Sequence, residues 1–292
     1  GAALLRSTGD TKRPLYALFM AGTVNLILNL FFVCVCDWGI AGVAIATVIS
    51  NVLSCATVVY FLTQDDGYLH LDLKAIRSDW TELKEILRIG IPSGLQGTVF
   101  SVANVAIQYA INSFGPKAIA GSSICLNYEL LNYYVIASFT QAAVTFTSQN
   151  YAARQFARAR KILYYIMASA IGMVFVSSMG TVLFRETLIN IFTDDPAAAE
   201  FARIRMMIII APYIISVVYE VLCATLRGMG YANLPTILMI VGICVFRLVW
   251  LATIQQWYNT YEVLCSIYPA SWLFTDIMLV AGYVWVSKQI KE

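Results

Sequence analysis

A ten-residue pattern occurs twice in this chain, near its start and near its end. Residues 5–14 and 226–235 share Leu-Arg-x-x-Gly-x-x-x-x-Pro at an offset of 221 residues. Two long apolar segments follow each copy, and four more lie between the copies. Internal repeats in an apolar chain are typical of membrane transporters built from two structural halves. The spacing therefore predicts a six-helix unit, of which this chain carries one complete copy and the last third of another.

The composition places the chain in lipid. Hydrophobic residues make up 60% of its 292 residues and charged residues 12%, which excludes an ordinary soluble domain. A net charge of +2 gives no reason to expect nucleic acid as a partner. A helix needs roughly 20 apolar residues to cross about 30 Å of hydrocarbon, so we predict an all-α membrane protein with eight transmembrane helices. They cover about residues 15–36, 40–62, 89–112, 118–149, 159–184, 206–226, 236–257 and 263–287.

These spans predict a division into three parts. Residues 1–64 are expected to end an N-terminal lobe with two transmembrane helices, and residues 89–292 to form a C-terminal lobe with six. Between them, residues 65–88 are rich in charge and are predicted to form a cytoplasmic linker between the lobes. Part of this linker has apolar residues at helical spacing, which indicates an amphipathic helix and leaves a regulatory role open: Trp80, Leu83 and Leu87.

The beginning of the chain and the long fourth span lead to two further expectations. Gly1 is not an initiator residue, and the repeat predicts four more helices before it, so we expect an N-terminally truncated chain that does not transport by itself. Residues 118–149 are too long for one straight crossing. We expect this helix to tilt or to extend beyond the bilayer.

The basic residues predict the orientation of the chain. Of the 19 Lys and Arg residues, alternate connections place 14 on one side. Only four lie on the other side, and one more is within a span: Lys117, Arg185, Arg203 and Arg205, and then Arg247. By the positive-inside rule the richer side is cytoplasmic. Both repeats and the C-terminus are then cytoplasmic, in a plasma (inner) membrane, and the repeats are parallel.

Nothing in the sequence indicates an enzyme. The seven cysteines match no zinc or redox spacing, and the one histidine, His70, lies in the polar linker, where we expect it to be solvated. No Ser/His/Asp grouping, phosphate loop or metal cluster is present. We therefore expect no cofactor and no resident metal.

Five motifs carry a resemblance to a known family. They are residues 5–14; the run 39–47, preceded by Asn25 and Asn29; residues 149–153; residues 220–230; and residues 268–272. In this order, and in these helices, they resemble the multidrug and toxic-compound extrusion (MATE) transporters. The resemblance covers essentially the whole chain.

The resemblance implies a twelve-helix exporter with two six-helix lobes around a central cavity. Such a protein expels organic cations or amphipathic drugs in exchange for Na⁺ or H⁺, and we expect it to be monomeric in membrane lipid. Some members carry an acidic cation ligand in the helix that corresponds to residues 89–112, which here has no charge. Others use an aspartate in the first helix of the first lobe. The choice between Na⁺ and H⁺ therefore stays open.

Four charged residues lie within the predicted spans: Glu129, Glu220, Arg247 and Asp276. A charged side chain in the bilayer costs upward of about 2.5 kcal/mol, so each needs a partner, a water path or a function. A carboxylate that alternates between protonated and cation-bound forms is what ion-coupled export requires. Alternatively, Arg247 permanently neutralises Glu220 or Asp276 and locks two helices together.

Polar residues suggest which helices line a cavity. Asn132 lies one turn after Glu129 on the same helix face, and Tyr128, Tyr133 and Tyr134 are nearby, where aromatic faces attract organic cations. The uncharged third span carries a stripe of four amides: Gln96, Asn104, Gln108 and Asn112. We interpret the stripe either as a wet cavity wall or as a seam between helices. The amides near Glu129 could likewise form hydrogen bonds between helices and not line a cavity.

The repeated pattern itself is interpreted as architecture. Arg6 and Arg227 end helices, where a cation stabilises the C-terminal end of the helix dipole. Gly9 and Gly230 are expected to allow the turn, and the next helices open with two prolines, Pro14 and Pro235.

Export has two alternatives, a flippase and a membrane scaffold or enzyme without transport. A flippase for a lipid-linked sugar, from the same superfamily, should line its cavity with several basic residues that hold phosphate, and only Arg247 lies within these spans. A membrane scaffold or a membrane enzyme gives no reason for duplicated halves.

Overall fold

The computed structural model describes residues 1–65, 67, 70–72 and 79–289, without the side chains of residues 85, 89 and 93. This part of the chain is helical and contains no strand, which confirms the predicted all-α class. It divides into two compact units, Gly1–Asp79 and Trp80–Glu292. Each unit is described by itself.

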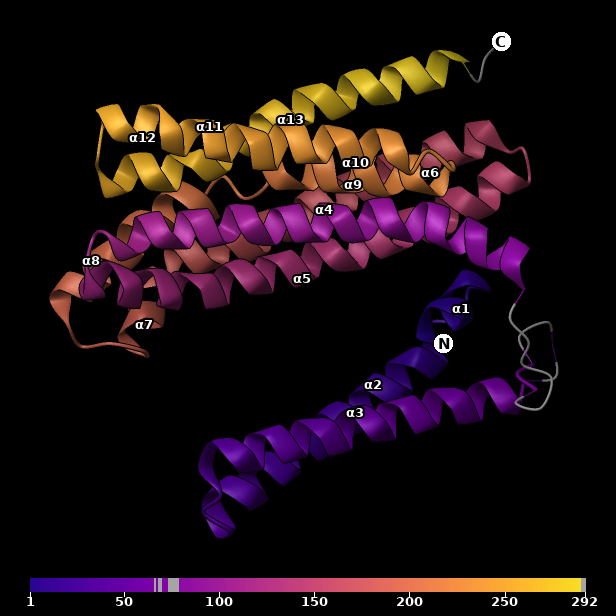
Figure 1. The fold of residues 1–292 in the computed structure, drawn as a ribbon, viewed down its shortest axis with the longest axis horizontal. Coiled ribbons are helices and arrows are strands. Elements are labelled where there is room, and N and C mark those ends of the chain that lie inside the picture. Colours follow the sequence, from indigo (N-terminus) through magenta and orange to yellow (C-terminus); the bar gives the residue numbers. More distant parts are fainter. Residues whose placement is uncertain (66, 68–69, 73–78, 290–292) are drawn as a thin grey trace. The chain divides into compact units, whose positions relative to one another are not determined.

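The first unit is a helical hairpin (Figure 1). The short helix α1 (Ala2–Ser7) precedes α2 (Lys12–Leu30), which continues into the π-helical turn η1 (Phe31–Val35). After a tight connection α3 (Gly39–Thr63) returns alongside α2. Most of the large apolar side chains on α2 and α3 are exposed, which is typical of a lipid-facing surface.

The second unit is a bundle of longer helices (Figure 1). Its core forms where α5, α6, α9 and α13 pack together. In chain order the elements are α4 (Trp80–Asn112), α5 (Pro116–Ala152), α6 (Phe156–Leu183), α7 (Arg185–Asn190), α8 (Pro196–Arg205), η2 (Met206–Ile210), α9 (Ile215–Gly228), α10 (Asn233–Met239), η3 (Ile240–Val245), α11 (Phe246–Ala252), α12 (Ile254–Trp257) and α13 (Tyr261–Gln289).

Among the described residues, five helices are long and apolar enough to cross a membrane, or six with one bent pair, rather than the eight predicted. The five are Lys12–Val35, Gly39–Thr63, Phe156–Leu183, Asn233–Trp257 and Tyr261–Gln289. The other two predicted spans, residues 89–112 and 118–149, do form the long helices α4 and α5. They are not among the five because polar side chains interrupt their apolar sequence.

The bent pair occupies the sixth predicted span. Pro196–Ile210 and Ile215–Gly228 meet at an angle of 50°, and Pro212 lies in the break between them. Proline lacks the N–H that would continue the helical hydrogen bonds, and its ring clashes with the preceding turn. Pro212 therefore accounts for the bend. Pro92 and Pro269, in contrast, lie inside the unbroken helices α4 and α13.

The predicted amphipathic helix of the linker is the start of α4. Trp80, Leu83 and Leu87 belong to the first turns of this helix, which runs on without a break to Asn112. Residues 66, 68–69 and 73–78 of the linker lie outside the described residues. His70 is exposed, as predicted, and its Nδ1 lies 3.0 Å from the backbone oxygen of Asp65.

The first copy of the repeat closes α1 with two backbone hydrogen bonds. The N–H of Gly9 donates to the carbonyl of Arg6 at 2.9 Å, and the N–H of Asp10 donates to the carbonyl of Leu5 at 3.1 Å. Gly9 adopts a φ of 88°. This is the Schellman arrangement, in which a residue with positive φ satisfies the last free carbonyls of a helix.

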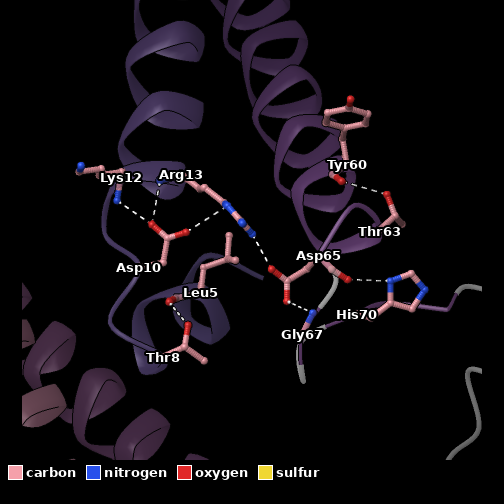
Figure 2. Close-up of polar contacts among 10 residues, drawn as sticks. All are labelled: Leu5, Thr8, Asp10, Lys12, Arg13, Tyr60, Thr63, Asp65, Gly67 and His70. Carbon is pink, nitrogen blue, oxygen red and sulfur yellow. Dashed lines mark hydrogen bonds and ion pairs between the residues drawn. The ribbon is translucent and has the colours of Figure 1, made fainter.

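Side chains then tie this turn to the end of α3 (Figure 2). One oxygen of Asp10 accepts the backbone N–H groups of Lys12 and Arg13 at 3.0 and 3.2 Å, which caps the start of α2. The Arg13 guanidinium bridges Asp10, at 3.2 Å, and Asp65 just beyond α3, at 2.7 Å. The two ends of the hairpin are thereby held together.

The second copy forms the same turn with different side chains. The N–H of Gly230 donates to Arg227 and the N–H of Tyr231 to Leu226, each at 3.0 Å, and the φ of Gly230 is 91°. Tyr231 takes the position of Asp10 here, and Leu234 takes that of Arg13. The ion pairs that Arg13 forms in the first copy therefore have no counterpart in the second. The backbone conformation at the glycine is what repeats.

We predict that Gly230→Ala lowers thermal stability through backbone strain alone. No atom lies within 4 Å of the position that its Cβ would occupy, but an L-residue in the left-handed region costs about 1–2 kcal/mol. The measurement is the thermal unfolding temperature of the purified protein in detergent. Gly172→Ala, inside α6 and equally free of neighbours, is the matched control and should be neutral or slightly stabilising. Equal effects of the two changes would contradict the prediction.

Candidate functional site

Small residues bring α5 and α8 unusually close together. A Cβ on Gly121 would lie 2.5 Å from the backbone oxygen of Ala198 and 2.7 Å from the backbone nitrogen of Ala202. Asp195 caps α8 by accepting the N–H of Ala197 at 3.0 Å, and it also forms an ion pair with Lys117 at the start of α5. The close approach fixes the end of α8 beside the middle of α5.

This contact creates a buried ion pair. Arg205, the last residue of α8, donates Nε to Oε1 of Glu129 at 2.7 Å and Nη2 to Oε2 at 3.1 Å. The side chain of Arg205 is 4% exposed and that of Glu129 is 10% exposed. The Tyr213 hydroxyl donates to the backbone oxygen of Glu129 at 3.3 Å. The fork of two parallel hydrogen bonds gives the strongest geometry available to a guanidinium and a carboxylate.

The sequence did not reveal Arg205 as the partner of Glu129. Arg203 and Arg205 were both counted as basic residues of an outer connection, but both belong to α8. Residues two positions apart on a helix point about 200° apart. Arg203 accordingly reaches the exposed Glu186, whose pKa it lowers by donating hydrogen bonds to the carboxylate. Arg205 turns inward.

A cavity of about 380 Å³ lies beside this ion pair. Helices α4, α5, α8, α9, α11 and α13 and the bend before α9 contribute to its wall. Its lining is polar and aromatic, and consists of Phe100, Asn104, Ile107, Gln108, Ile111, Ser122, Ser123, Leu126, Glu129, Tyr133, Arg205, Tyr213, Tyr219, Glu220, Arg247, Tyr268 and Trp272. Its volume is in the range of a small-molecule site.

The sequence offers eight residues as substrate or ion ligands, namely the four charged residues of the spans, Asn132, Gln96, Asn104 and Gln108. Five of these eight line this cavity: Asn104, Gln108, Glu129, Glu220 and Arg247. Among the described residues, Glu220 makes no hydrogen bond and no ion pair, although it lines the cavity. Glu220 is therefore the lining carboxylate without a direct partner.

The other three predicted residues lie elsewhere in the second unit. Gln96 accepts a hydrogen bond from Arg227, so the amide stripe of α4 is a helix seam at Gln96 and a cavity wall at Asn104 and Gln108. Asn132 is fully buried and donates to the Tyr128 carbonyl at 3.0 Å. Asp276 is 8% exposed, and its Oδ1 has no hydrogen-bond partner in the part of the chain that the structure describes.

The predicted neutralisation of Glu220 or Asp276 by Arg247 is not found among the described residues. Arg247 instead donates Nε to Oγ of Ser271 at 3.1 Å, and its guanidinium carbon lies 4.5 Å from the centroid of the Tyr268 ring. The buried ion pair described above forms at Glu129 instead, where the close contact of α5 with α8 brings Arg205 to the carboxylate.

Most aromatic residues of the cavity wall are not the tyrosines beside Glu129 that the sequence analysis indicated. Of the three tyrosines near Glu129, only Tyr133 lines the cavity, while Tyr134 is exposed. Tyr213 and Trp272 meet edge to face, with ring centroids 5.2 Å apart. The sequence signal that could have indicated this wall is the spacing of Tyr268 and Trp272, four residues apart on one face of α13.

No group of three or more His, Cys, Asp or Glu residues that could hold a metal ion is present in the described ranges. The described cavity lining offers two carboxylates, two guanidiniums, amides and aromatic rings. Such a wall can bind a solute by charge and by ring contacts.

Comparison with known proteins identifies relatives of this chain. The MatE family profile matches residues 92–252. The chain is 26% identical over 254 residues to a probable multidrug resistance protein, NorM, of Thermotoga maritima, covering 85% of this chain and 54% of that protein. It is 26% identical over 307 residues to the probable multidrug resistance protein YoeA of Bacillus subtilis, covering 98% of this chain and 64% of that protein.

Solved structures have the same fold. A MOP superfamily transporter from Pyrococcus furiosus superposes with a TM-score of 0.85 at 20% identity, over 98% of this chain and 64% of that one. The chain thus spans 54–64% of the length of these three proteins.

We predict that Glu129→Gln destabilises the protein, because it leaves a buried guanidinium without its counter-ion. Breaking a buried ion pair from one side costs roughly 3–5 kcal/mol, whereas replacing both partners by apolar residues is often nearly neutral. The double variant Glu129→Leu with Arg205→Met should therefore recover most of the unfolding temperature that Glu129→Gln loses. A double variant less stable than the single one would show that the pair does not hold α5 and α8 together.

Proposed function

Since this chain belongs to the MatE family, we propose that it acts in a secondary active exporter of cationic or amphipathic small molecules. Export is coupled to Na⁺ or H⁺ moving inward, by alternating access between two lobes. The second unit corresponds to the C-terminal lobe, and the first unit to the end of the N-terminal lobe. All eight long helical segments span the membrane, the protein is monomeric, and both repeat turns and the C-terminus face the cytoplasm.

The observation that carries this proposal is the cavity with its partnerless carboxylate. Glu220 lines it without a hydrogen bond or an ion pair among the described residues, and Tyr133, Tyr213 and Tyr219 line it too. A carboxylate in low dielectric gains most from a bound cation or a proton. Aromatic faces add about 0.5–2 kcal/mol each for an organic cation. Relatives named as multidrug resistance proteins agree with such a solute.

The two carboxylates of the cavity have different tasks. Glu129 is neutralised by Arg205, so it holds the wall together and does not exchange cations. Glu220 is the group that is loaded and unloaded. Coupling follows if the closed cavity can reorient only when Glu220 is protonated or bound to a cation, because an uncompensated carboxylate disfavours closure around it.

The lipid-linked sugar flippase is less well supported by the cavity. Holding a phosphate group would favour several unpaired basic residues. The described lining has two guanidiniums, and one of them is already bound to Glu129.

We predict that Glu220→Gln reduces export at least about tenfold, equivalent to about 1.4 kcal/mol. The measurement is ethidium efflux from cells that express the complete gene, under an imposed Na⁺ or proton gradient. Glu262→Gln, an exposed position at the start of α13 with the same change of charge, is the control and should export like the parent.

Two results would contradict parts of the proposal. Unchanged, ion-coupled export by Glu220→Gln removes Glu220 from the mechanism. If the parent moves no organic cation under either gradient, the export function itself is wrong.

A further inference from the structure

The cavity contains a second buried charge that the proposed function does not use. Arg247 on α11 is 5% exposed and lines the cavity wall. Its Nε donates to Ser271, but its two Nη groups make no hydrogen bond and no ion pair in the described part of the chain. A buried cation without a counter-ion is costly, so the site favours an anion that comes from outside the protein.

A comparison with Arg205 makes the difference clear. Both guanidiniums lie against the same ring: their central carbons are 5.3 Å (Arg205) and 4.5 Å (Arg247) from the centroid of Tyr268. Arg205 has its counter-ion built in as Glu129, with two hydrogen bonds. Arg247 has the same aromatic support and no carboxylate.

The internal carboxylates do not fill this role. Glu129 is engaged with both of its oxygens, and Glu220 forms no ion pair with Arg247 among the described residues. Asp276, on α13 five residues after Ser271, is absent from the described cavity lining and also forms no ion pair there with Arg247. The open Nη groups are therefore free to bind a ligand in the cavity.

The surroundings of Arg247 indicate the chemical class of that ligand. A guanidinium presents a planar fork of donors that matches the two oxygens of a carboxylate. The adjoining wall is aromatic: Tyr213 and Trp272 meet edge to face beside Tyr268, with Tyr268 and Trp272 centroids 6.2 Å apart. The cavity volume of about 380 Å³ fits a molecule of one or two fused rings.

We propose that Arg247 is the anion-binding group of this cavity, and that it holds the carboxylate of an aromatic, amphipathic solute whose ring packs against Tyr213 and Trp272. This inference rests on the proposed function, because such a carboxylate is then among the exported molecules. It adds a specificity determinant for anionic groups to a cavity whose carboxylate, Glu220, favours cations.

The test uses three ligands that share one ring system. Binding of 2-naphthoate, 2-naphthylmethanol and 2-naphthylmethylammonium to the protein in nanodiscs is measured by equilibrium dialysis, with empty nanodiscs subtracted. We expect the parent to bind naphthoate at least about tenfold more tightly than the alcohol. Arg247→Met should lose this preference. Arg160→Gln, which removes an exposed cation outside the cavity lining, should keep it.

A conservative variant distinguishes the loss of the binding group from misfolding of the protein. Arg247→Lys keeps the charge but loses the fork, and we expect an intermediate preference for naphthoate in a protein with the parent's unfolding temperature. The proposal is overturned if Arg247→Met or Arg247→Lys binds naphthoate like the parent. It is also overturned if inorganic phosphate alone displaces naphthoate at equal concentration, or if Arg247→Met weakens binding of the ammonium ligand as much as that of naphthoate.

The same variants separate this inference from the proposed function. Ethidium export by the parent, together with naphthoate binding that is lost in Arg247→Met, supports both. Naphthoate binding that depends on Arg247 in a protein that exports no organic cation supports the anion site and refutes the export function. Ethidium export by a parent that shows no preference for naphthoate supports the export function and refutes the anion site.

Discussion

The cost of burying charge is the constraint on which this structure depends. The second unit buries Glu129, Arg205, Arg247 and Asp276 almost completely, and a buried charge is tolerated when a partner or a ligand compensates it. Arg205 and Glu129 compensate each other through two hydrogen bonds. That pairing depends on the contact of α5 with α8, which in turn depends on the absence of a side chain at Gly121. A small backbone detail thus decides which charges remain available in the cavity.

The remaining charges define what the cavity can do. Glu220 and Arg247 carry charges of opposite sign and line the same cavity. They form no ion pair with each other among the described residues. Tyr213 and Tyr219 line the same space. Such a wall can accept a cation at one place and an anion at another, which broadens the range of solutes beyond what either group alone would allow.

The two copies of the repeat illustrate how conformation can repeat while chemistry diverges. Both end a helix with a glycine at a φ near 90° and the same pair of backbone hydrogen bonds. Around this turn the first copy uses Asp10, Arg13 and Asp65 to join the ends of a hairpin. In the second copy Arg227 reaches across to Gln96 on α4. The backbone requirement is local, whereas the side chains serve different neighbours.

Local sequence alone determined the helical segments, the turns at Gly9 and Gly230 and the bend at Pro212, because apolar length, backbone conformation and a missing N–H act within a few residues. It also indicated five residues of the cavity wall, since a polar side chain inside an apolar helix is conspicuous. Only the tertiary structure decided that Glu129 pairs with Arg205, that Arg247 has no carboxylate, and that Asp276 stays outside the described lining. These outcomes depend on how the bent segment from α8 to α9 packs against α5 and α13, and the directions of side chains on separate helices cannot be read from their spacing along one chain.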